Sequence, residues 1–116
     1  MLTIGPELAQ AMESGTLARW KQEIAARIAS DFSQAAGFDR NILETWVRQA
    51  IHVVRRAGAT NRGDIELYAH ALFRVTEAPP DDRALTDFIA IMTAPGDFTL
   101  RIKTLRKAFP LDRTPP

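Results

Sequence analysis

The chain has 116 residues, of which 46% are hydrophobic and 25% charged, and these values are typical of one folded globular domain and not of a disordered segment. Fifteen Lys and Arg against fourteen Asp and Glu leave a net charge of +1, so no strong overall field attracts nucleic acid or acidic lipid. Cysteine is absent, which excludes disulfides, thiolate-bound metal and a thiol nucleophile. We expect a single domain over residues 1–116.

We expect neither a secretory signal nor a membrane-spanning segment. Residues 1–13 contain two acids and no basic residue, unlike a secretory signal. No stretch approaches the roughly 18–20 apolar residues that cross a bilayer. We therefore expect a cytoplasmic protein with no membrane contact, and a frayed tail over residues 111–116, which ends in two prolines.

Apolar residues recur at helical spacing after residue 16. At about 100° per residue, five of them fall within a sector about 120° wide, the stripe of an amphipathic helix. They are Leu17, Trp20, Ile24, Ile28 and Phe32. Gly37 is placed to end this helix, and Asp39 to cap the next one.

The next predicted helix has the widest apolar stripe, which covers roughly half its circumference. Its apolar positions are Ile42, Leu43, Trp46, Val47, Ala50, Ile51, Val53 and Val54. We therefore expect it to be a central helix contacted from several sides. Its polar face holds Arg48, His52, Arg55 and Arg56, and Gly58 ends it.

Three further helices are predicted in the second half. Thr60 or Asn61 can cap a helix whose buried side is Ile65, Tyr68, Ala69, Leu72, Phe73 and Val75. After Pro79-Pro80, Asp81 or Asp82 can start a short helix with the stripe Leu85, Phe88, Ile89 and Met92. The turn 94–97 precedes a last helix with Phe98, Ile102, Leu105 and Phe109. No window alternates with a period of two, so the sequence predicts an all-α, compact, bundle-like domain of about five helices.

A short N-terminal helical segment, residues 1–14, does not share this pattern. Leu8 and Met12 are four residues apart, and they point roughly 150° away from the stripe that follows. Ser14-Gly15 lies at the change of direction. Either a separate short helix folds onto the bundle, which is the more ordinary arrangement, or one long helix presents its first turns to a partner. The second arrangement makes Leu8 and Met12 candidate partner-binding residues.

The polar residues give no catalytic or metal-binding pattern. His52 lies among arginines, and His70 lies between Glu66 and Arg74 on what the helical wheel gives as a polar face. We expect both histidines to be solvated and their replacement by Ala to change little. No HExxH spacing, serine elbow or glycine-rich phosphate loop is present. We expect no enzymatic activity, no metal and no cofactor.

The stretch around Gly58 has some features of a helix-turn-helix, a glycine turn followed by a cap and an apolar residue. The spacing from Gly58 to Ile65 is one residue longer than usual, and Asp64 and Glu66 would face the phosphates with Arg62 alone to balance them. We do not expect nucleic acid as a partner. A small helix-turn-helix-like regulator stays an alternative.

The chain resembles small all-helical proteins encoded in bacterial type VI secretion loci, beside spike-tip and toxin genes. The resemblance rests on loose patterns spread over most of the chain: Pro6-Glu7, Leu17-Ala18-Arg19-Trp20, the Gly58 turn with Thr60 and Asp64, Ile65 to Phe73, Pro79-Pro80-Asp81-Asp82 and Arg101-Ile102 to Leu105. Ala57 and Val75-Thr76-Glu77 depart from the family pattern. The resemblance implies an accessory role in toxin loading or neutralisation and supplies no active-site residue.

The leading hypothesis is therefore a non-enzymatic adaptor or co-chaperone. Its expected partner is a secreted effector, the effector's loading chaperone or a spike-tip protein. An immunity protein that neutralises a co-encoded toxin is the alternative within the same setting. The candidate partner-binding residues are Leu8, Met12, Arg55, Arg56 and Arg62.

Overall fold

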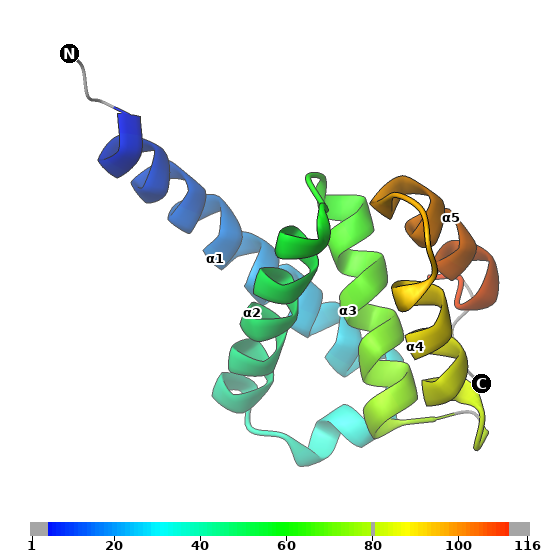
Figure 1. Ribbon diagram of the computed structural model, residues 1–116. Coiled ribbons are helices and arrows are strands. Elements are labelled where there is room, and N and C mark those ends of the chain that lie inside the picture. Colours follow the sequence, from blue (N-terminus) through cyan, green and yellow to red (C-terminus); the bar gives the residue numbers. More distant parts are fainter. Residues whose placement is uncertain (1–4, 80, 112–116) are drawn as a thin grey trace.

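The computed structural model describes the backbone of residues 5–79 and 81–111, and the side chains from residue 15 onward within those ranges (Figure 1). Its elements are α1 (Gly5–Asp31), the 3-10 helix η1 (Ser33–Gly37), α2 (Arg40–Ala57), α3 (Arg62–Glu77), α4 (Ala84–Thr93) and α5 (Phe98–Ala108). No strand occurs in the part of the chain that is described. The predicted all-α class with five helices is confirmed.

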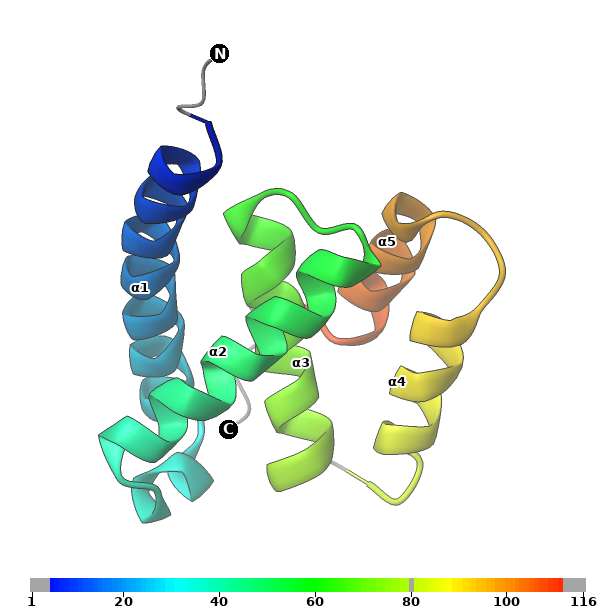
Figure 2. The same cartoon turned by 60° about the vertical axis from the view of Figure 1, so that its left-hand side comes forward.

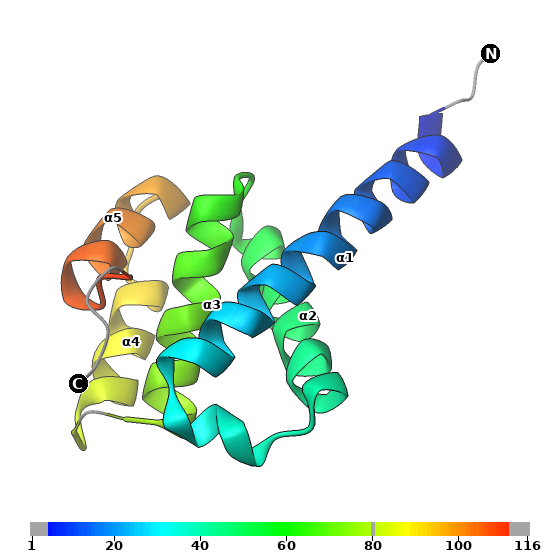
Figure 3. The same cartoon turned by 180° about the vertical axis from the view of Figure 1, so that it is seen from behind.

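The N-terminal segment is not a separate helix, because α1 is one helix of 27 residues that runs through Ser14 and Gly15. The prediction of a short helix folded onto the bundle is therefore wrong. The first turns of α1 project past the other helices in Figures 1 and 3. The radius of gyration, 15.2 Å, accordingly exceeds the roughly 13 Å of a compact chain of this length. The side chains of Leu8 and Met12 lie outside the described residues.

The central helix is α3, and the prediction that α2 is central is wrong. Ten residues of α3 are buried, compared with five residues of α2. The helix α3 packs on α1, α2, α4 and α5. Figures 1 and 2 show α3 between these helices. On α2, Ile42 and Val53 from the wide apolar stripe are 58% and 55% exposed. The wide apolar stripe of α2 is therefore only partly covered by the other helices.

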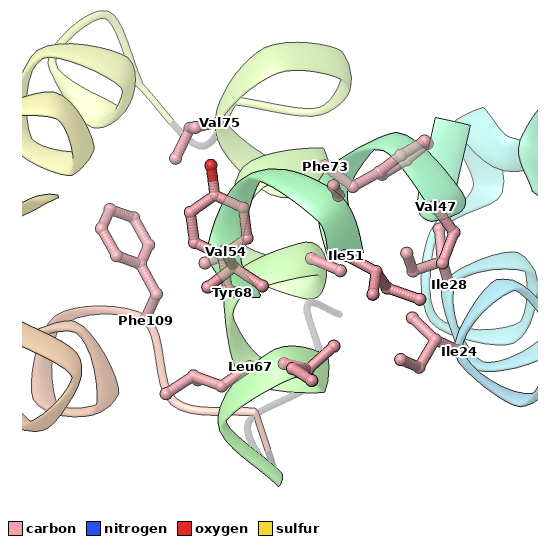
Figure 4. Close-up of a cluster of buried hydrophobic side chains, with 14 of the residues drawn as sticks. Ile24, Ile28, Val47, Ile51, Val54, Leu67, Tyr68, Phe73, Val75 and Phe109 are labelled. Atoms are coloured by element: carbon pink, nitrogen blue, oxygen red, sulfur yellow. The ribbon is translucent and has the colours of Figure 1, made fainter. Parts of the chain in front are cut away.

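The core has two connected parts. Ile24 and Ile28 of α1 face Val47 and Ile51 of α2 in Figure 4, as the stripes of both helices predict. Phe73 of α3 is fully buried, and it packs edge-on against the rings of Phe38 and Trp46 and, tilted, against Phe32.

The second part of the core joins α3 to the last two helices through the rings of Tyr68, Phe88 and Phe109. The stripe predicted for α4 is only half right. Phe88 is buried, whereas Leu85 and Ile89 are 42% and 50% exposed. Only one side of α4 is covered, since its neighbours are α3 and α5.

Local capping decides where most helices begin. Asp39, Asn61 and Asp97 each accept a hydrogen bond from a backbone N–H in the first turn of α2, α3 and α5. The first helix ends at Asp31, before the predicted Gly37, because the 3-10 turn of η1 intervenes. Gly58 ends α2 with φ at +126°, a conformation in which a side chain is strained.

Candidate functional site

Arg55, Arg56 and Arg62 are the predicted partner-binding residues whose side chains the structure describes. Arg55 and Arg56 are exposed in the last turn of α2, where their positive charges interact favourably with the negative end of the helix dipole. Arg62 begins α3 and is half-buried, and its guanidinium pairs with Glu23 at 3.1 Å and Glu66 at 3.3 Å. Arg62 therefore holds α3 to α1, and its side chain, 39% exposed, stays a candidate for partner binding.

A groove lies between α1 and α2, just below the projecting turns of α1. We call it the α1–α2 groove; its volume is about 310 Å³, and it is lined by Leu17, Ala18, Lys21, Arg48, Ile51 and His52. Ile51 is only 2% exposed and forms its floor with Leu17. A second hollow of about 340 Å³ continues along α2 and is lined by Gln49, His52, Val53 and Arg56. His52 lines both, so the two hollows are neighbours.

The rim of these hollows is cationic. Lys21 is partly neutralised by Glu44, 3.7 Å away. Arg48 and Arg56 are exposed, and neither has an ion-pair partner among the described residues. No acid occurs in the sequence from residue 45 to residue 63, so this part of α2 supplies no carboxylate to offset Arg48 and Arg56. An apolar floor with a cationic rim is suited to an apolar surface that has acidic flanks.

The prediction that His70 is solvated is wrong, because this residue is only 1% exposed. Its Nε2 lies 2.8 Å from Oδ2 of Asp31 at the end of α1, and its ring lies 4.8 Å from the ring of Phe32. Burial lowers the pKa of His70, and the nearby Asp31 carboxylate only partly opposes this. The neutral ring therefore donates Nε2–H to Asp31.

The His70–Asp31 contact is one end of a polar network between α1 and α3. Arg27 donates from Nε to Oδ2 of Asp31 at 3.2 Å, and its Nη1 lies 3.6 Å from Glu66. Glu66 also pairs with Arg62, and Arg62 with Glu23. The network therefore fixes the position of α1 against α3, and with it one wall of the α1–α2 groove.

A signal for this network is present in the sequence. On α1, acid, base and acid follow at intervals of four: Glu23, Arg27 and Asp31. On α3, the same interval gives Arg62, Glu66, His70 and Arg74. Each row forms a stripe along one helix face, and their charges are complementary. Either row alone looks solvated, and only pairing them reveals an interface.

The geometry gives the His70–Asp31 pair a structural role. Neither of the two hollows is lined by His70 or Asp31. Within residues 15–79 and 81–111, no three His, Asp or Glu side chains are arranged to hold a metal ion. The described helices include none with the length and apolar character needed to span a membrane.

Comparison of the chain with protein-family models, with curated proteins and with solved structures finds no match. The candidate functional site is the α1–α2 groove with its cationic rim.

Proposed function

We propose that this chain is a non-enzymatic protein-binding protein whose α1–α2 groove receives a partner. The observation that carries the proposal is the groove itself, with an apolar floor at Leu17 and Ile51 and a rim that includes Arg48 and His52. Grooves of this kind accept the apolar face of a helix, and charges at the rim select the partner. The first turns of α1 project past the other helices beyond Leu17, which lines the groove (Figure 3).

The resemblance to type VI secretion proteins suggests the class of partner. On this proposal the chain is an adaptor for a secreted effector, its loading chaperone or a spike-tip protein. The alternative role, immunity against a co-encoded toxin, is separated by a toxin-neutralisation assay. The cationic groove argues against an inhibitor that imitates nucleic acid, because such an inhibitor needs an acidic surface.

The burial of α3 argues against a helix-turn-helix regulator. In that alternative, α3 would follow the Gly58 turn and enter the major groove. Instead, α3 lies at the centre of the described fold, and ten of its residues, from Ile65 to Val75, are buried. It has no free face long enough to contact bases.

Affinity purification from the native host tests the proposal. The variant carries Arg48→Glu and His52→Glu, and the matched control carries Lys103→Glu and Lys107→Glu on the exposed side of α5. We expect wild type and control to retain the same partner, and the groove variant to bind it about tenfold or more weakly, because the Arg48 charge is reversed and a second carboxylate is added at the rim. Undiminished binding by the groove variant, or recovery of no partner by any of the proteins, would refute the proposal.

A further inference from the structure

We propose that a second copy of this chain occupies the α1–α2 groove, with the first turns of α1 from each copy lying in the groove of the other. The inference goes beyond the proposed function, because it assigns the groove an occupant in the absence of any other protein. Three observations support it: the projection of α1, the composition of its first turns and the charge of the groove.

The first turns of α1 need a packing surface. They project past the other helices of the same copy (Figures 1 and 3), and a short helix without tertiary contacts is marginal in water. Gly15 lies within this helix, and a Cβ built on it meets nothing within 4 Å. Glycine in a helix interior weakens the helix by about 1 kcal/mol relative to Ala. A helix continued through Ser14-Gly15 therefore calls for support from outside its own copy.

The first turns also have the composition that the groove accepts. Residues 5–14 contain Glu7 and Glu13 and no basic residue, and Leu8 and Met12 are spaced to share one helix face. The groove offers the complement, an apolar floor and cations at the rim. About 15 Å of helix in these ten residues is enough to cross a groove one turn long.

Reciprocal insertion closes the assembly at two copies. Each copy carries both the acidic segment and the basic groove, so a two-fold axis gives two identical contacts and leaves neither segment nor groove empty. The same contact also makes self-association and partner binding compete for the groove. A bound partner is then expected to displace the second copy.

A charge-swap experiment tests the dimer by light scattering and sedimentation over a concentration series. We expect wild type to be a dimer. For this experiment the groove variant carries Arg48→Glu in the α1–α2 groove and Arg56→Glu in the adjoining hollow, and the segment variant carries Glu7→Lys and Glu13→Lys. Each should raise the dissociation constant about a hundredfold, because the repulsion occurs at both contacts. Mixing the two variants should restore a dimer, since a lysine segment then meets a glutamate groove and a glutamate segment meets an arginine groove.

The control variant, Lys103→Glu with Lys107→Glu, should stay a dimer, and helical content by circular dichroism should show that every variant is folded. As a check on the apolar contact, Leu8→Asp with Met12→Asp should also give a monomer, and its thermal stability should match that of the groove and segment variants. A monomeric wild type, a groove or segment variant that still dimerises alone, or a mixture that stays monomeric would overturn the inference. If the wild type is monomeric and its partner capture still depends on Arg48, only the dimer is refuted and the proposed function stands.

Discussion

Replacement of His70 by Ala should be strongly destabilising, whereas the same change at His52 should not. His70 is 1% exposed, and the change removes both its ring contact with Phe32 and its hydrogen bond to Asp31. Emptying a site of this size and losing a hydrogen bond to a charged group together cost about 3 kcal/mol. For a chain of this length that corresponds to a fall in Tm of roughly 12 °C. His52 is exposed on α2, and His52→Ala should cost less than about 0.5 kcal/mol.

The dependence of stability on pH gives His70 a second signature. Because burial lowers the pKa of His70 below its ordinary value of 6.5, the unfolded chain binds more protons than the folded chain once the pH falls below that value. The free energy of unfolding contributed by His70 is therefore present above pH 6.5 and is lost as the pH falls from there through the folded pKa. His70→Leu should remove this loss and so flatten the curve.

Urea unfolding at several pH values measures both effects, with His52→Leu as the matched control. A His70→Ala variant as stable as His52→Ala would refute the burial of His70. A wild type that gains stability relative to His70→Leu on acidification would show that the Asp31 carboxylate raises the pKa of His70 more than burial lowers it. In that case the neutral Nε2–H donor described above is wrong.

Three other predictions concern single sites. Gly15→Ala should raise the free energy of unfolding by about 0.5–1 kcal/mol, because α1 is continuous at Gly15 and the new Cβ meets nothing within 4 Å. A loss of stability would show that the helix is broken at Gly15. Gly58→Ala should lower the free energy of unfolding by about 1–3 kcal/mol, because φ is +126° and the new Cβ would lie 3.0 Å from the Cβ of Phe98. Thermal melting measures both glycine variants, and an unchanged Tm for Gly58→Ala would contradict a strained turn. Burial raises the pKa of Tyr68 above 10.0. In an alkaline titration, the phenolate absorbance of the folded chain should therefore appear at a higher pH than that of the unfolded chain.

Features set by near neighbours in the sequence were predicted well. Asp39 was predicted as a cap, and Asn61 as one of two candidates with Thr60, because each side chain reaches a backbone N–H two or three residues away and no distant residue is needed. Asp97, predicted only as part of a turn, caps α5 in the same way. The stripe of α1 from Leu17 to Phe32 was predicted for the same reason, since its spacing alone defines one face.

Features set by distant neighbours were not predicted. The wheel places His70 on a polar face, but α3 is enclosed by other helices, and the acid that satisfies His70 is 39 residues away in the sequence. Ser14-Gly15 suggested a break because both residues are weak helix formers. For the candidate site, helical periodicity predicts the outward face of Arg48 and His52 but not the groove, because the groove also needs the packing of α1 against α2.

The central position of α3 has a consequence for how the chain opens to solvent. Every other α-helix packs on α3, so its amide hydrogens are exposed only when several interfaces separate together. Hydrogen exchange in α3 should therefore report the free energy of global unfolding. In a lone copy, the first turns of α1 have no such neighbours, and their amides should exchange by local fraying. Within one chain, the slowest helical exchange is then expected in α3 and the fastest in the first turns of α1, although one polar network joins these two helices.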